Sequence, residues 1–134
     1  PASSFAARGD LDLDTTSLTF PNTDPRASAS IPAEENPIRI KVKYSGKGTW
    51  ILTVLADGDL VAGSDAIPIS RVRWTATGDD YVSGTMNKTT PQLVGSGGRN
   101  PKGSQGTLSL FLQNDWDYST GYYTQSIVFT LTVL

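Results

Sequence analysis

Apolar residues recur at every second position along most of this chain, and that spacing favours β-strands over helices. Segment 38–44 (Ile-Arg-Ile-Lys-Val-Lys-Tyr) has one apolar face and one cationic face, and segment 72–76 repeats the pattern. Segments 108–112 and 127–133 show the same spacing. The segment most able to form a helix, 32–36, is closed by Pro37 and is predicted to be a turn or a single helical turn.

Turn signals separate these segments at intervals typical of a β-sandwich. The sequence therefore predicts an all-β fold, an antiparallel immunoglobulin-like sandwich of about six to seven strands. Segment 50–55 is apolar on both faces, so we expect it centrally in a sheet, in a hairpin with 38–44 across the turn 45–48. The glycine-rich segment 95–103 is predicted to be a loop.

The composition excludes most kinds of catalytic site. The 134 residues include neither histidine nor cysteine, which removes Ser-His-Asp and thiol chemistry, disulfides and the common zinc sites. A pair of carboxylates is the catalytic option that is left, but the adjacent Glu34 and Glu35 lie in a predicted turn without a cleft pattern. We therefore expect no enzyme and no cofactor.

Charge and hydropathy bear on the partners. A net charge of −2 and a pI near 4.9 argue against a nucleic-acid partner. No apolar run reaches the length of a bilayer, so no membrane span is predicted. The sequence begins at Pro1 and its one methionine is Met86, which favours a removed signal peptide and secretion, with a trimmed initiator methionine as the alternative.

The N-terminal residues form a pattern of their own, and we divide the chain into an N-terminal extension, 1–14, and a sandwich domain, 15–134. Phe5, Ala7, Leu11 and Leu13 alternate with polar residues, and the later ones with a row of aspartates. This pattern has two interpretations. The extension is the first strand or a solvated tail of its own sandwich, or it is a strand donated to a neighbouring subunit.

The C-terminal segment 121–134 begins with Gly-Tyr-Tyr and continues with threonines that alternate with apolar residues. It resembles the closing strand of spore-coat-protein-U-like and related chaperone–usher-type pilin domains, and the alternating N-terminal extension is similar too. The resemblance covers the last fourteen residues and the general layout. The absence of a cysteine pair departs from many of these pilins and leaves other secreted filament-forming sandwiches open.

The resemblance implies an incomplete sandwich whose missing strand comes from the next subunit. It implies that Phe5, Ala7, Leu11 and Leu13 are donor residues and that the acceptor groove is lined by Ile127, Phe129, Leu131 and Val133. The expected function is then that of an extracellular structural subunit, polymerised into a cell-surface filament by donor-strand exchange. Its expected partners are further copies of itself, with an assembly chaperone and usher as candidates.

Two further groups of residues are candidate sites. Asp57, Asp59 and Asp65 could offer oxygens to calcium, but they lack the spacing of a calcium loop, and Asp-Gly is also an ordinary turn, so no metal site is predicted. Trp116, Tyr118 and Tyr122 lie in a polar segment and are candidate ligand contacts, whereas Trp50 and Trp74 are expected in the core. These aromatic residues support the alternatives, a carbohydrate- or surface-binding module or a virion or coat decoration protein.

Overall fold

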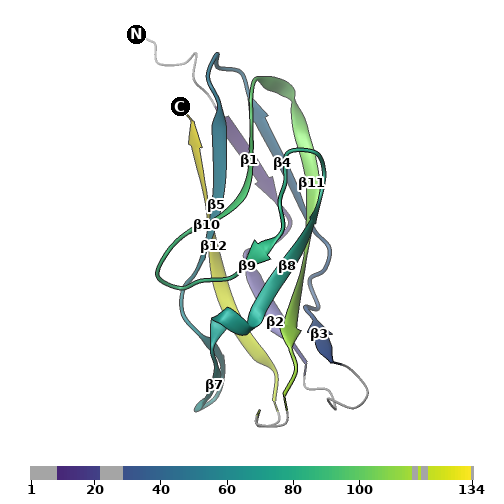
Figure 1. Ribbon diagram of the computed structural model, residues 1–134, viewed down its shortest axis with the longest axis vertical. Coiled ribbons are helices and arrows are strands. Elements are labelled where there is room, and N and C mark those ends of the chain that lie inside the picture. Colours follow the sequence, from purple (N-terminus) through teal and green to yellow (C-terminus); the bar gives the residue numbers. More distant parts are fainter. Residues whose placement is uncertain (1–8, 22–28, 116–117, 119–120, 134) are drawn as a thin grey trace.

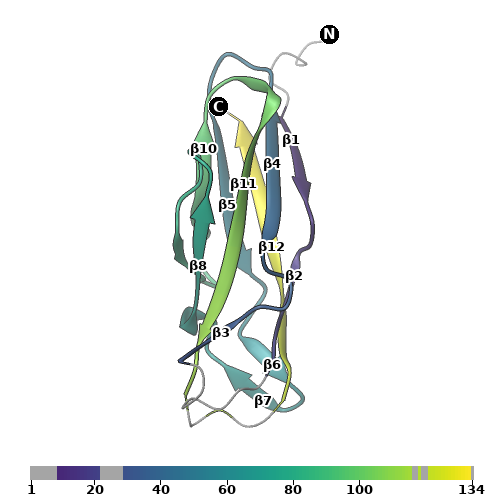
Figure 2. The ribbon, with the colours of Figure 1, turned by 90° about the vertical axis from the view of Figure 1, so that its right-hand side faces the viewer.

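Two antiparallel sheets packed face to face make up the described part of the protein, which comprises residues 9–21, 29–115, 118 and 121–133 of a computed structural model. Figure 1 shows the two layers edge-on, and Figure 2 looks onto the layer that contains β4, β11 and β8. The all-β sandwich predicted from the alternation is confirmed. No helix among the described residues is long and apolar enough to span a membrane.

Each sheet has six strands. The first runs in the order β1-β4-β11-β8-β9, with β3 paired to β11, and comprises β1 (Gly9–Leu13), β3 (Ser30–Pro32), β4 (Ile38–Tyr44), β8 (Val72–Thr77), β9 (Gly84–Thr85) and β11 (Asn100–Gln113). The second runs β10-β5-β12-β6-β7, with β2 paired to β12, and comprises β2 (Ser17–Phe20), β5 (Trp50–Ala56), β6 (Leu60–Ala62), β7 (Asp65–Ile67), β10 (Gln92–Gly97) and β12 (Tyr123–Val133). The strands outnumber the prediction because several are pieces of two to four residues.

The core lies between the sheets and is built from the apolar side of each alternating strand. In β4 and β5 every second side chain is buried, as the spacing predicts. Trp50 and Trp74 are core residues, as expected, with exposed fractions of 0% and 2%. The Tyr81 ring lies 6.0 Å from that of Trp50, and its hydroxyl donates a hydrogen bond of 2.8 Å to the carbonyl of Ser104. Burial raises the pKa of Tyr81, so its hydroxyl stays protonated as this donor.

The predicted hairpin between segments 38–44 and 50–55 is wrong. β4 pairs with β1 and β11 in one sheet, whereas β5 pairs with β10 and β12 in the other. The turn 45–48 therefore connects the two layers. Both strands bury an apolar face in the common core, but they do so from opposite sheets and are not neighbours in one sheet. The central position predicted for β5 is confirmed.

The predicted glycine-rich loop is also wrong, because most of 95–103 belongs to β10 and β11. Gly97 pairs with Trp50 across the sheet, and a Cβ added to Gly97 would lie 2.9 Å from Nε1 of that tryptophan. A larger residue at this position would overlap the indole ring. The glycine therefore permits close packing on an aromatic core side chain in an ordered strand.

The side chain of Asn36 should make a measurable contribution to the stability of the fold. Its Nδ2 donates to the carbonyl of Leu110 at 2.8 Å, and its Oδ1 accepts the N–H of Leu110 at 2.9 Å. Asn36→Ala leaves this partly buried N–H without that partner and should lower the free energy of unfolding by about 1–3 kcal/mol. Urea unfolding measures the loss. Glu34→Ala, at an exposed position of the same turn, is the control and should change it by less than about 0.5 kcal/mol.

Candidate subunit interface

The first strand of the sandwich is divided between the two sheets. β1 pairs with β4 as far as the Leu13–Ile40 pair, and the chain then crosses over and continues as β2, which pairs with β12. The crossing is complete at Thr16, whose carbonyl accepts the N–H of Ile127 at 2.8 Å. The lower part of β12 therefore has a partner on this side, whereas β1 lies beside the upper part but belongs to the other sheet.

The upper part of β12 has an open edge. Ile127 directs its N–H to Thr16, and Ser126 directs its carbonyl to Asp57 on the β5 side. Because backbone groups of successive strand residues point to opposite edges, Phe129, Leu131 and Val133 direct theirs away from β5. No described strand pairs with that edge beyond Thr16. Their N–H and C=O groups are therefore available to a further strand.

The side chains at this edge are apolar and incompletely covered. Ile127 is buried, but Phe129, Leu131 and Val133 are only partly buried. Leu11 and Leu13 of β1 are also partly buried. Together these five make up most of the eight partly buried apolar residues that pack on the core in the described part of the chain. We call Leu11, Leu13, Phe129, Leu131 and Val133 the seam. Apolar surface is thus concentrated where the two sheets adjoin at β1 and β12.

Within one chain, β1 packs beside the seam residues of β12. A Cβ added to Gly9 would lie 3.0 Å from the side chains of both Leu131 and Val133, so β1 lies directly against β12. β1 begins at the end of the sandwich where β12 finishes (Figure 1). Of the predicted donor residues, Leu11 and Leu13 lie in this strand, while Phe5 and Ala7 lie outside the described residues. The donor role that the resemblance implies for all four stays a prediction.

The aspartates of β1 match the cations of β4 in register. Asp10 lies opposite Lys43 and Asp12 opposite Lys41, and Oδ2 of Asp14 accepts the N–H of Arg39 at 3.1 Å. Opposite charges at facing positions stabilise a strand pair by about 0.2–1 kcal/mol. The charge pattern therefore specifies how this segment docks on β4.

An open groove of about 560 Å³ lies beside this charged pair of strands. Its polar lining includes Asp12, Asp14, Arg39, Lys41, Gln105 and Thr107. Both signs of charge are present, so the groove has no net preference for anions or cations. Leu13 is the one predicted site residue among the described lining residues.

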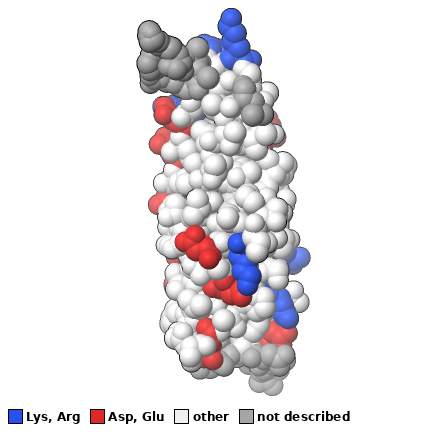
Figure 3. Space-filling view, turned by 90° about the vertical axis from the view of Figure 1, so that its left-hand side faces the viewer, with Lys and Arg blue, Asp and Glu red and all other residues white. Residues whose placement is uncertain are grey.

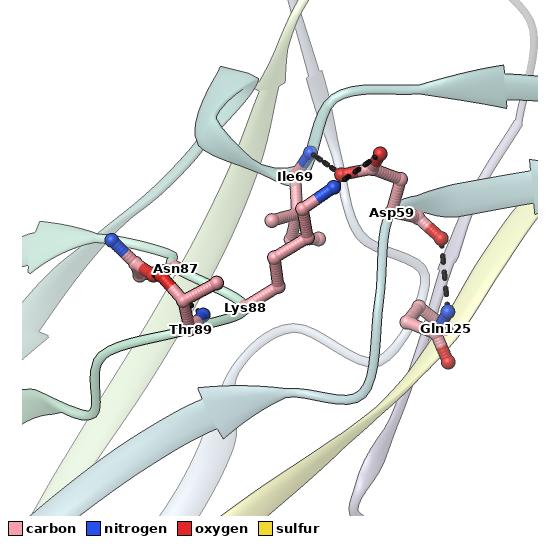
Figure 4. Close-up of polar contacts among 6 residues, drawn as sticks. All are labelled: Asp59, Ile69, Asn87, Lys88, Thr89 and Gln125. Atoms are coloured by element: carbon pink, nitrogen blue, oxygen red, sulfur yellow. Dashed lines mark hydrogen bonds and ion pairs between the residues drawn. The ribbon is translucent and has the colours of Figure 1, made fainter.

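The candidate calcium ligands do not form a site in the described structure. Figure 4 shows that Asp59 is already engaged: one carboxylate oxygen accepts the Lys88 ammonium at 2.9 Å and the other accepts the N–H of Ile69 at 3.0 Å. Its carbonyl accepts Nε2 of Gln125 at 2.9 Å. Among the described residues, no three Asp or Glu side chains are grouped to hold a metal ion. Asp59 instead ties three segments of the lower end together, a role that sequence reasoning missed.

The three aromatic candidates do not come together as a described platform. Trp116 lies outside the described residues. The Tyr118 hydroxyl donates to the carbonyl of Gln113 at 2.7 Å and accepts from Arg71 at 3.3 Å, so it serves a local network. Tyr122 is 64% exposed. Of Tyr118 and Tyr122, only Tyr122 exposes most of its side chain to a ligand.

Comparisons with protein-family models, curated proteins and solved structures each give no match to this chain.

Reversing the charges of β4 should loosen β1 without unfolding the sandwich. Lys41→Glu with Lys43→Glu places like charges opposite Asp12 and Asp10, which should cost about 1 kcal/mol in total. We expect unchanged near-ultraviolet circular dichroism from the buried tryptophans and faster hydrogen exchange in β1. Adding Asp10→Lys and Asp12→Lys should restore the slow exchange. Global unfolding of the first variant would show that the faces of β4 are assigned wrongly.

Asp59 should stabilise the fold in a pH-dependent way. The hydrogen bond from Lys88, and then that from Ile69, hold its pKa below the ordinary 3.8. The contribution is therefore present at neutral pH and is lost as the pH falls through the folded-state pKa. Asp59→Asn should cost up to about 1 kcal/mol at pH 7, and Asp59→Ala about 1–3 kcal/mol, because it also removes the acceptor for Ile69.

Urea unfolding between pH 7 and pH 2.5 measures these differences. The gap between the wild type and Asp59→Asn should narrow below pH 3.8. Asp57→Asn, in the same turn and exposed, is the matched control. An equal loss in the control at pH 7 would contradict the assignment.

Proposed function

We propose that this protein is an extracellular structural subunit, similar to a pilin, that polymerises by strand exchange into a surface filament. The observation that carries the proposal is the edge of β12 at half-buried Phe129, Leu131 and Val133, with which no strand among the described residues pairs. An edge of this kind is a template for a strand from another chain.

The donor in this proposal is the N-terminal segment of a neighbouring copy. Leu11 and Leu13 already pack at the seam within one chain, so exchange moves an existing set of contacts from one copy to the next. In the filament, burial of Phe5 in the next copy contributes about 1.5–3 kcal/mol, and hydrogen bonds to the β12 edge contribute about 0.5–1.5 kcal/mol each. These gains must exceed an association cost of about 4–15 kcal/mol, which requires the donor to fill most of the edge.

The same geometry suggests why assembly needs control. An uncovered apolar edge promotes aggregation, and within one chain β1 lies beside that edge without pairing to it. A secreted subunit with this arrangement requires either β1 in place or an assembly chaperone on the edge until the next copy arrives. The proposal therefore includes two partners, the next copy of the chain and an assembly chaperone.

A reversible lock on β1 tests the exchange. Asp12→Cys with Lys41→Cys places two thiols at facing positions, where Cα atoms are about 4.5–5.5 Å apart and within disulfide range. The natural chain contains no cysteine, so no other thiol competes. We expect the oxidised variant to stay monomeric in light scattering and electron microscopy, and to form filaments once it is reduced.

The two single-cysteine variants are the controls and should polymerise with or without reductant. If the oxidised double variant polymerises as fast as the wild type, β1 is not exchanged between copies. Loss of filaments on deletion of residues 1–8 would then place the donor in that segment alone. A wild-type chain that remains monomeric at every concentration would overturn the proposal.

A further inference from the structure

The second sheet has a central region without charged side chains. β5, β10 and β12 contain no Lys, Arg, Asp or Glu over their whole lengths. The facing strands of the first sheet differ, since β1 carries Asp10 and Asp12 and β4 carries three cations. One outer face of this small sandwich is therefore charged, with both signs present, and the central strands of the other face are neutral.

The outward side chains of this region are aliphatic or hydroxylic. They include Ile51, Thr53 and Leu55 of β5, with Leu93 of β10 and Val128 and Thr130 of β12 beside them, and we call these six the neutral face. Leu93 and Val128 are each 47% exposed. In Figure 3 the middle of this face is uncharged above a cluster of acidic and basic side chains in its lower half, and other charged side chains lie at the ends and along the edges.

Charge selects the partner for this face. A neutral surface gains nothing from a charged partner and must desolvate it, so its best partner is another neutral surface. The first sheet presents Arg39, Lys41 and Arg73 among its outward residues. The matching surface on a second copy is therefore the neutral face itself, in a two-fold arrangement that places the same patch on both sides.

The area of the face indicates how such a contact is used. Seven residues of β5 at about 3.3 Å each, across three strands about 4.8 Å apart, cover roughly 330 Å². A stable pair of proteins needs about 800 Å² from each partner. One pair of neutral faces is thus too small to hold two free copies together, whereas a row of such pairs along two filaments adds up by multivalency.

We infer that the neutral face packs laterally on the neutral face of a copy in a neighbouring filament and joins filaments side by side. This inference rests on the proposed function, because it takes the filament as the source of the repeated contact. Polymerisation uses the seam and bundling uses the outer face of the same sheet, so the two can be separated by mutation.

A charged pair of substitutions tests the inference in the full chain. Leu93→Glu with Val128→Glu charges the neutral face, and Thr75→Glu with Thr85→Glu, at exposed positions of the first sheet, makes the same change of charge elsewhere. We expect both variants to form filaments. In electron microscopy, the fraction of laterally paired filaments should be about tenfold smaller for the first variant than for the wild type, because the repulsion repeats at every subunit. The control variant should bundle like the wild type.

Where filaments form, each other outcome overturns the inference. Bundles that persist in the first variant, or that are lost equally in both, show that filaments do not join through this face. Retention of wild-type filaments on insoluble polysaccharide, lost in the first variant while bundling stays, would assign the face to a carbohydrate partner. If the wild type forms no filaments, the proposed function fails, and sedimentation at high concentration tests the neutral face separately. Weak self-association of the wild type that the first variant alone abolishes supports self-contact through the neutral face. Absence of such self-association overturns it.

Discussion

Each edge of a β-strand pairs with one neighbour at a time, and the first strand of this protein serves two sheets in turn. It pairs with β4 as far as Leu13 and with β12 from Ser17 onward. The sandwich gains a strand at each sheet in this way, but no strand in the described part of the chain pairs with the upper edge of β12. The half-buried seam and the charge-matched docking of β1 both follow from that crossing.

Alternation predicted most of the strands and most of the core, because burial of every second residue is a local property. It did not predict which strands are neighbours. The sequence of β4 and β5 is typical of a hairpin, but the two strands belong to opposite sheets and each buries its apolar face in the common core. The glycines before Asn100 read as a loop because nothing nearby in the sequence shows that Gly97 must fit against Trp50. Such contacts depend on residues that are far apart in the chain.

The candidate interface was predictable in part for the same reason. The inward row from Ile127 to Val133 follows from spacing, but which members remain uncovered depends on where β2 begins. A signal for that was present: the apolar positions are odd at Leu11 and Leu13 and even at Leu18 and Phe20, and this change of phase marks the crossing between sheets. The role of Asp59 had no such signal, because its partners Ile69 and Lys88 are distant in sequence.

The direction of β12 bears on how a filament of these subunits would carry load. β12 runs along the long axis of the molecule (Figure 1). A strand added at its open edge would lie parallel to that axis, and a pull along the filament would load its hydrogen bonds in shear. In shear the bonds resist together, whereas in peeling they break one after another. Tensile strength would thus come from the orientation of the edge, with no covalent link between subunits.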